Sequence, residues 1–207
     1  MTDLYNGRKV LLLKTKQAMY EVRWHARGGQ GAVTASRFLS AAGVREQKHF
    51  QAFPEFGTER MGAPIQAFTR ISPEKIYLHS QVQTPDAVVV LDPTLLKAVD
   101  VVAGLKDGGT LVVNSSDSPA VVRQQAKAEG KAIKVFTVDA DTIARECVGR
   151  PITNTAMVGA LVRATGLLQF DNVREELRAT FGNRFKASIV EGNIRALERA
   201  YEEVVSE

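Results

Sequence analysis

The hydrophobic pattern of the chain becomes regular at residue 20. Residues 20–24 alternate between apolar and charged side chains, and this period of two is typical of a β-strand. The glycine-rich residues 28–31 interrupt the alternation. Apolar positions in residues 35–42 then recur at helical spacing, and Gly43 is expected to end the helix. The pattern therefore predicts a strand, a glycine turn and a helix in direct succession.

Short apolar runs predict further strands. Residues 87–91 and 110–113 are rich in β-branched side chains without alternation, which indicates strands covered on both faces. Residues 135–138 predict one more strand of this kind. Residues 50–53 and 65–71 predict two strands on either side of a loop.

Helices are expected between and after these strands. Asp92 and Pro93 are the residue types of an N-cap and a first helical position. No strand is predicted beyond Pro151, and Asn154 or Thr155 is expected to cap the first of the helices there. These C-terminal helices are predicted at residues 155–165, 173–181 and 189–204.

Strands that alternate with helices predict an α/β fold, namely a mostly parallel sheet with helices on both faces and a helical C-terminal segment. Residues 1–18 show no clear period and are expected to form an N-terminal extension. Residues 19–207 are expected to form a single domain, because no linker or internal repeat divides them.

Composition narrows the class of protein. A hydrophobic share of 44% and a charged share of 24% are typical of a soluble globular protein. The apolar run at residues 10–13 is much shorter than a signal-peptide core or a membrane span, so a cytoplasmic location without a membrane partner is expected. The net charge is +4, but the sequence has no cluster of basic residues interleaved with aromatic ones. This absence argues against nucleic-acid binding.

Metal chemistry is not expected on this chain. Cys147 is the single cysteine, whereas iron–sulfur clusters are held by several thiolates, so any clusters belong on other chains. His25, His49 and His79 lack metal-ligand spacing. The sequence contains neither a Ser, His and Asp catalytic set nor a thiamine-binding pattern. These absences favour a subunit over a complete enzyme.

The stretch Arg-Gly-Gly-Gln-Gly at residues 27–31 is the first candidate binding site. Glycines between a strand and a helix let the backbone approach a ligand closely, and the helix N-terminus that follows favours an anion. Arg27 adds a positive charge, so one interpretation is a phosphate or pyrophosphate seat. A tight turn in which glycine only avoids a steric clash explains the spacing equally well. Thr34 stands where a dinucleotide fingerprint has its last glycine or alanine, so a nicotinamide site is weakly supported.

A loop at residues 53–64 is the second candidate. It has prolines near both ends and carries Glu55, Glu59 and Arg60. In one interpretation it shapes a ligand pocket or docks against another chain, and in the other it is a self-paired surface loop.

In their order along the chain, these stretches resemble the gamma subunit of the pyruvate (2-oxoacid):ferredoxin oxidoreductase family. The resemblance covers roughly residues 19–205 and depends on the ordered set rather than on any one motif. The matching stretches are residues 27–31 (RGGQG), 53–64 (FPEFGTERMGAP), 68–71 (FTRI), 79–81 (HSQ), 85–93 (PDAVVVLDP) and 152–157 (ITNTAM).

The resemblance implies an enzyme that converts pyruvate, coenzyme A and oxidised ferredoxin to acetyl-CoA, CO2 and reduced ferredoxin. The gamma-type chain is implied to contribute to coenzyme A binding and assembly, without catalytic residues of its own. Thiamine diphosphate, Mg and [4Fe-4S] clusters are then expected on the alpha, beta and delta subunits, and ferredoxin or flavodoxin binds through the complex. The residues implied to contact coenzyme A are Arg27, Gly28, Gly29, Gln30, Gly31, Glu59 and Arg60.

Two features depart from the family pattern. Met61 stands where a second arginine is expected, and the extension before Met19 is not typical. Residues 79–93 are more similar to the pyruvate type than to the alternatives, which are the gamma subunits of 2-oxoglutarate or branched-chain oxidoreductases. An alternative of another class is a stand-alone Rossmann-type nucleotide-binding enzyme.

Overall fold

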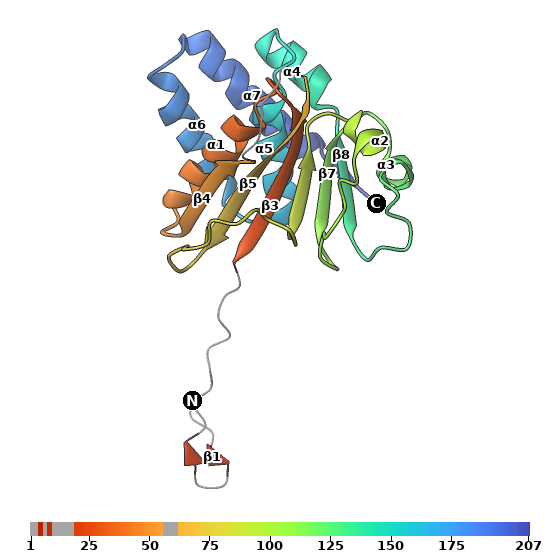
Figure 1. Ribbon diagram of the computed structural model, residues 1–207. Coiled ribbons are helices and arrows are strands. Elements are labelled where there is room, and N and C mark those ends of the chain that lie inside the picture. The colour runs from red at the N-terminus through yellow and green to blue at the C-terminus, as the bar shows by residue number, and fades with distance from the viewer. Residues whose placement is uncertain (1–3, 6–7, 10–18, 56–61) are drawn as a thin grey trace.

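The structure is a computed structural model, which describes residues 4–5, 8–9, 19–55 and 62–207. A seven-stranded sheet forms its centre (Figure 1). The strands are β3 (Tyr20–Arg27), β4 (His49–Pro54), β5 (Pro64–Ser72), β6 (Ala87–Val90), β7 (Thr110–Asn114), β8 (Lys134–Val138) and β9 (Val205–Ser206), in the order β4-β5-β3-β6-β7-β8-β9. Two further short strands, β1 (Leu4–Tyr5) and β2 (Arg8–Lys9), pair with each other.

The middle of the sheet is parallel. Strands β3, β6, β7 and β8 pair in parallel, while β5 pairs antiparallel with both β3 and β4 at one edge. The predicted α/β fold with a largely parallel sheet is confirmed. The prediction that no strand follows Pro151 is wrong, because β9 pairs antiparallel with β8. Two residues are too few to carry a periodic pattern, so this strand depends entirely on its neighbour.

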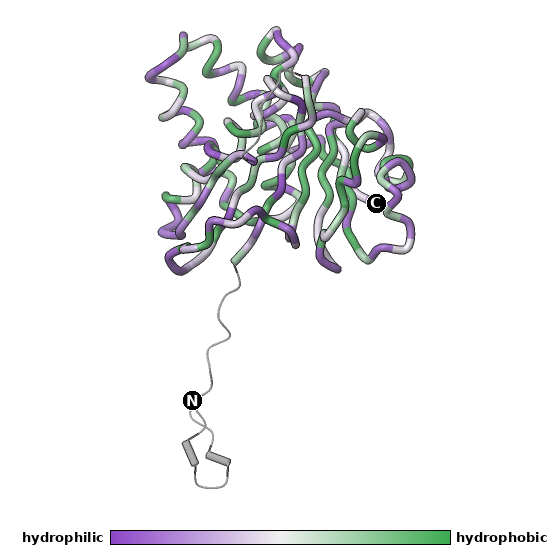
Figure 2. Tube along the Cα trace, viewed as in Figure 1, coloured by the Kyte–Doolittle hydropathy of each residue, from purple (hydrophilic) through white to green (hydrophobic). Residues whose placement is uncertain are grey.

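Helices cover both faces of the sheet, as predicted (Figure 1). On one face lie α1 (Ala32–Val44), α4 (Ala140–Val148), α5 (Asn154–Thr165), α6 (Phe170–Gly182) and α7 (Ala187–Glu203), which share one hydrophobic cluster with β3 and β6. On the other face α2 (Leu95–Ala98) and α3 (Pro119–Gln125) share a second cluster with β6, β7 and β8. Figure 2 shows apolar residues concentrated along the central strands, as expected for strands buried on both faces. None of the helices in the described ranges is long and apolar enough to cross a bilayer.

Several helix boundaries differ from the predicted ones for reasons of packing. Helix α1 continues through Gly43 to Val44, because the Phe50 ring lies against Gly43, where a Cβ would be 1.6 Å from the Phe50 Cζ atom. Gly43 therefore provides space for β4 and does not end the helix. The prediction that Asp92 and Pro93 begin a helix is wrong, because α2 begins at Leu95 with Thr94 at its N-cap position. The N-cap position of α5 is occupied by Thr153, rather than Asn154 or Thr155, without a side-chain hydrogen bond.

The face of β3 and β5 opposite α1 is covered by residues 73–86, and buried charge holds this segment in place. Arg70 is only 1% exposed. Its Nε atom donates to Glu21 Oε1 at 2.9 Å, and its guanidinium also donates to the carbonyl oxygens of Leu78 and Ser80. Because these carbonyls belong to the covering segment, the buried Arg70 side chain helps to fasten that segment to the sheet, together with Gln51, whose Nε2 atom donates to the Leu78 carbonyl at 2.8 Å.

His25 belongs to the same face and is buried beside Arg23. Its Nε2 atom accepts a hydrogen bond from Arg23 Nε at 3.1 Å, and Arg23 also donates to the carbonyl oxygens of Val101 and Ala103. Burial, and then the charge of Arg23, lower the pKa of His25 from 6.5 to about 3. His25 is therefore neutral in the folded chain at neutral and mildly acidic pH.

This shift predicts a loss of stability in acid. Between pH 6.5 and about 3 the unfolded chain takes up a proton at His25 that the folded chain excludes, so the free energy of unfolding should fall as the pH falls. His25→Gln keeps an acceptor for Arg23 and should flatten this dependence. His79→Gln, at an exposed position, is the control. Urea unfolding across the range measures the effect, and equal slopes for all three proteins would contradict the prediction.

Candidate functional site

The carboxyl ends of the parallel strands meet at one edge of the sheet. There the glycine turn at residues 28–31 follows β3, and Asp92 comes shortly after β6. The chain runs from β3 to strands on one side of it and then returns to β6 on the other side. This is a topological switch point, the position where open α/β sheets bind ligands.

The glycine turn has one open and one packed end. Gly29 and Gly31 have φ angles of 96° and 85°, values that side-chain-bearing residues rarely adopt. Gly29 is exposed, and a Cβ built on it meets no atom within 4 Å. A Cβ on Gly31 would lie 2.7 Å from Asn154 Nδ2, at the start of α5. The turn is therefore pressed against α5 at Gly31 and open at Gly29.

Helix α1 begins directly at this turn with free backbone donors. Gly31 is its N-cap and provides no side-chain cap, and its first turn contains no acidic residue. The first intrahelical bond runs from the Ala35 N–H to the Gly31 oxygen at 2.9 Å. The N–H groups of residues 32–34 donate to no group in the part of the chain that the structure describes. Together with the helix dipole, these donors favour an anion.

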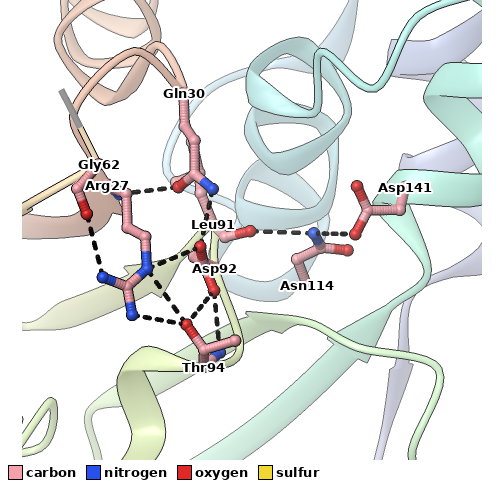
Figure 3. Close-up of polar contacts among 8 residues, drawn as sticks. All are labelled: Arg27, Gln30, Gly62, Leu91, Asp92, Thr94, Asn114 and Asp141. Atoms are coloured by element: carbon pink, nitrogen blue, oxygen red, sulfur yellow. Dashed lines mark hydrogen bonds and ion pairs between the residues drawn. The ribbon is translucent and has the colours of Figure 1, made fainter. Parts of the chain in front are cut away.

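Arg27 is held by contacts within the chain (Figure 3). Its Nη2 atom donates to Thr94 Oγ1 at 2.9 Å, and its Nη1 atom donates to the Gly62 carbonyl at 3.0 Å. Its Nε atom lies 3.3 Å from Asp92 Oδ2. Arg27 therefore links the end of β3 to the segments that follow β6 and precede β5.

Gln30 closes the same network. Its Oε1 atom accepts from the Arg27 backbone N–H at 2.7 Å, and its Nε2 atom donates to Asp92 Oδ2 at 2.8 Å. Burial opposes ionisation of Asp92, but hydrogen bonds from Thr94 and Gln30 and the charge of Arg27 outweigh it and lower the pKa. Asp92 is thus a charged anchor that fixes the shape of the turn.

The polar edge continues to β7. The Asn114 Nδ2 atom donates to the Leu91 carbonyl at 2.9 Å and to Asp141 Oδ2 at 3.0 Å, and the Asn114 Oδ1 atom accepts from the Ala140 N–H at 3.0 Å. Sequence reasoning did not identify the roles of Asp92 and Asn114. Both are polar residues at the carboxyl end of a buried strand, and this position indicates that they belong to the site.

The predicted site residues fall into two groups. Arg27, Gly28, Gly29, Gln30 and Gly31 lie together, as described above. Glu59 and Arg60, like Met61, lie outside the described residues.

The described end of the predicted loop is nevertheless fixed to the glycine turn. The Gly28 N–H donates to the Ala63 carbonyl at 2.9 Å, and the Gly62 N–H donates to the Gly28 carbonyl at 3.2 Å. The loop at residues 53–64 therefore returns to the sheet beside the candidate anion seat. Within the described residues no group of three or more His, Cys, Asp or Glu side chains is placed to hold a metal ion.

Comparison with known proteins identifies the family. Residues 21–203 match the family described as pyruvate ferredoxin/flavodoxin oxidoreductase. The chain is 50% identical over 184 residues to the "Pyruvate/ketoisovalerate oxidoreductases common subunit gamma" of Pyrococcus furiosus, a match that covers 89% of this chain and 96% of the relative. It is 44% identical over 185 residues to the "Pyruvate synthase subunit PorC" of Thermotoga maritima, covering 89% and 94% of the two chains.

Solved structures agree with these relatives. The crystal structure of pyruvate oxidoreductase subunit PORC from Thermotoga maritima superposes with a TM-score of 0.79 at 41% identity, over 91% of this chain and 98% of that chain. A 2-oxoglutarate:ferredoxin oxidoreductase from Magnetococcus marinus, solved with coenzyme A bound, shares the fold at 18% identity and a TM-score of 0.69, over 90% of this chain and 31% of that chain.

The family prediction is confirmed by these matches, and they do not support a stand-alone Rossmann-type enzyme. The chain belongs to the pyruvate ferredoxin/flavodoxin oxidoreductase family, among its gamma subunits.

Proposed function

We propose that this chain, as the gamma subunit of a pyruvate:ferredoxin oxidoreductase, provides a seat for the phosphate groups of coenzyme A and helps to assemble the enzyme. The complete enzyme converts pyruvate, coenzyme A and oxidised ferredoxin to acetyl-CoA, CO2 and reduced ferredoxin. Coenzyme A supplies the thiol that receives the acetyl group. The observation that carries the proposal is the start of α1, whose free N–H groups lie beside an exposed glycine at the switch point of the sheet.

The residues of the turn have different roles in this proposal. Gly29 lets a phosphate approach the backbone closely, because no side chain stands over it. Gln30 and Arg27 are bound to Asp92, so they hold the donors in position, and Arg27 adds positive charge. Glu59 and Arg60 remain predicted contacts, since their loop returns to the turn at Gly62 and Ala63.

The rest of the chemistry is proposed to reside on the partners. Thiamine diphosphate, Mg and the [4Fe-4S] clusters belong to the alpha, beta and delta subunits in this proposal, and ferredoxin or flavodoxin binds through the complex in the cytoplasm. The Pyrococcus furiosus relative is named as a subunit common to pyruvate and ketoisovalerate oxidoreductases. A shared subunit supports a role in handling coenzyme A, which both reactions need, and leaves selection of the 2-oxoacid to other chains.

A charge placed at the start of α1 tests the proposal. Thr34 is exposed in the first turn of α1, where a carboxylate interacts favourably with the helix dipole. Thr34→Glu should therefore preserve the fold of the chain while it repels the phosphates. We expect the KM for coenzyme A to rise about tenfold or more, equivalent to about 1.4 kcal/mol, with the KM for pyruvate unchanged.

Thr34→Gln is the matched control, because glutamine has nearly the same shape as glutamate but carries no charge. Steady-state kinetics of the reconstituted complex give both constants, and omission of this chain should abolish the coenzyme A-dependent reaction. An unchanged KM for coenzyme A in an intact Thr34→Glu complex would favour the other interpretation, in which the glycines serve only the turn.

A further inference from the structure

A cavity lies between α1, the segment that joins α4 to α5, and the turn between α6 and α7. It adjoins the candidate anion seat, because Thr34 and Asn154 also line it. Its volume is about 730 Å³, and its lining is mostly apolar. We call it the arginine-rimmed cavity, after three of its lining residues, Arg37, Arg150 and Arg184. Each comes from a different one of these three segments of the chain.

About half of the other arginines in the described chain are paired with carboxylates. Arg45, Arg70 and Arg199, for example, each form an ion pair with a glutamate. The guanidinium groups of Arg37, Arg150 and Arg184 contact no carboxylate among the described residues, and no Asp or Glu lines the cavity. Three positive charges without a counter-charge attract an acidic partner.

The cavity is also where exposed apolar side chains gather. Phe185 is 47% exposed, Ile152 44% and Ile189 40%, and all three line the cavity. The Phe185 ring centroid lies 5.3 Å from that of Phe181, with the rings tilted by 59°, and Phe181 in turn lies 6.4 Å from Phe38. A row of aromatic rings therefore runs from the core to the surface. Apolar groups clustered on a surface and rimmed by charge are the mark of a protein interface.

We propose that the arginine-rimmed cavity docks a segment of another subunit, an apolar stretch flanked by carboxylates. A peptide segment can present several carboxylates, which suits arginines that come from three different segments of the chain. The apolar residues of such a segment would cover Phe185, Ile152 and Ile189, as in known groove-binding peptides. The proposal rests on the proposed function only in requiring that this chain assembles with other subunits.

Photocrosslinking in the whole complex identifies the occupant. Phe185 is replaced by p-benzoylphenylalanine, the complex is irradiated, and the joined peptides are sequenced by mass spectrometry. We expect a peptide of another subunit that contains apolar residues and at least two carboxylates. Tyr77 is the control position, because it is exposed in the segment that covers β3 and β5 and does not line the cavity. The same substitution at Tyr77 should not yield that peptide. Crosslinks confined to this chain would overturn the proposal.

Charge reversal tests the contribution of the rim. Arg184→Glu should raise the dissociation constant for the other subunits about tenfold or more, as measured by titrating the complex with salt. Arg178→Glu is the matched control, because Arg178 lies exposed on α6 and does not line the cavity. Normal assembly of Arg184→Glu together with a raised KM for coenzyme A would show that a small anion occupies the cavity, and normal assembly alone would likewise overturn docking.

The two proposals fail in different ways. If the wild-type chain retains no other subunit, both the proposed function and the docking proposal are overturned. If the wild-type complex forms and Thr34→Glu alters coenzyme A use, but Arg184→Glu assembles normally, only the docking proposal is overturned.

Discussion

Replacing Gly31 by alanine is expected to destabilise the chain by about 2–4 kcal/mol and to weaken coenzyme A binding. An alanine with a φ angle near 85° is strained, and its Cβ would lie 2.7 Å from Asn154 Nδ2. Asn154 cannot move away freely, because it is buried and its Oδ1 atom accepts from the Thr155 N–H at 2.9 Å. The clash is therefore relieved by displacement of the glycine turn itself. Urea unfolding of the isolated chain and the KM for coenzyme A of the complex measure the two effects.

Gly29→Ala separates backbone strain from the clash. Gly29 has a similar φ angle of 96°, but a Cβ there meets nothing within 4 Å, so only the strain of about 1–2 kcal/mol is expected. Shortening the neighbour in the double variant Gly31→Ala/Asn154→Ser should recover part of the lost stability, as a negative coupling energy in a double-mutant cycle. Equal losses for Gly29→Ala and Gly31→Ala, without coupling to Asn154, would show that the packing of the turn on α5 is unimportant.

The central sheet could be predicted from the sequence because its signals are local. The alternation in β3 and the β-branched run in β6 each identify a strand without knowledge of the rest of the chain. A glycine turn that joins such a strand to a helix must then lie at the carboxyl edge of the sheet, which places residues 27–31 where ligands bind.

Features that depend on distant residues could not be predicted in this way. Gly43 looks like a helix end because glycine usually is one, but the Phe50 ring makes it a packing position inside α1. The strand β9 exists because β8 offers a free edge to two residues near the C-terminus. Neither neighbour is visible in the local pattern.

The same limit applies to the candidate site. The turn was predicted, but its anchor was not, because Asp92 is 62 positions from Gln30 and was interpreted as a helix cap. Asp92 accepts a hydrogen bond from the Thr94 N–H at 2.9 Å, which stabilises the turn before α2 although Asp92 is not its N-cap. Its contacts with Arg27 and Gln30 follow from the parallel pairing of β3 with β6, which brings the ends of these strands together.

The loss of the Arg70 charge is expected to destabilise the chain by about 3–5 kcal/mol. Arg70→Met keeps much of the side-chain volume but leaves the Glu21 carboxylate without its ion pair at 2.9 Å. It also removes the donors to the carbonyls of Leu78 and Ser80, so residues 73–86 lose two of their hydrogen bonds to the sheet. Urea unfolding gives the loss of stability, and hydrogen exchange of the amides in residues 73–86 shows whether that segment opens first.

The double variant Glu21→Gln/Arg70→Met distinguishes an unpaired charge from lost hydrogen bonds. If the unpaired Glu21 carboxylate causes most of the loss of stability, the double variant should be more stable than Arg70→Met alone, because the glutamine carries no charge. Exchange in residues 73–86 should stay fast in both, since neither variant restores the donors to Leu78 and Ser80. Slow exchange there in Arg70→Met would mean that the segment is held by its other contacts, such as the buried Val82, and that Arg70 is not its fastening.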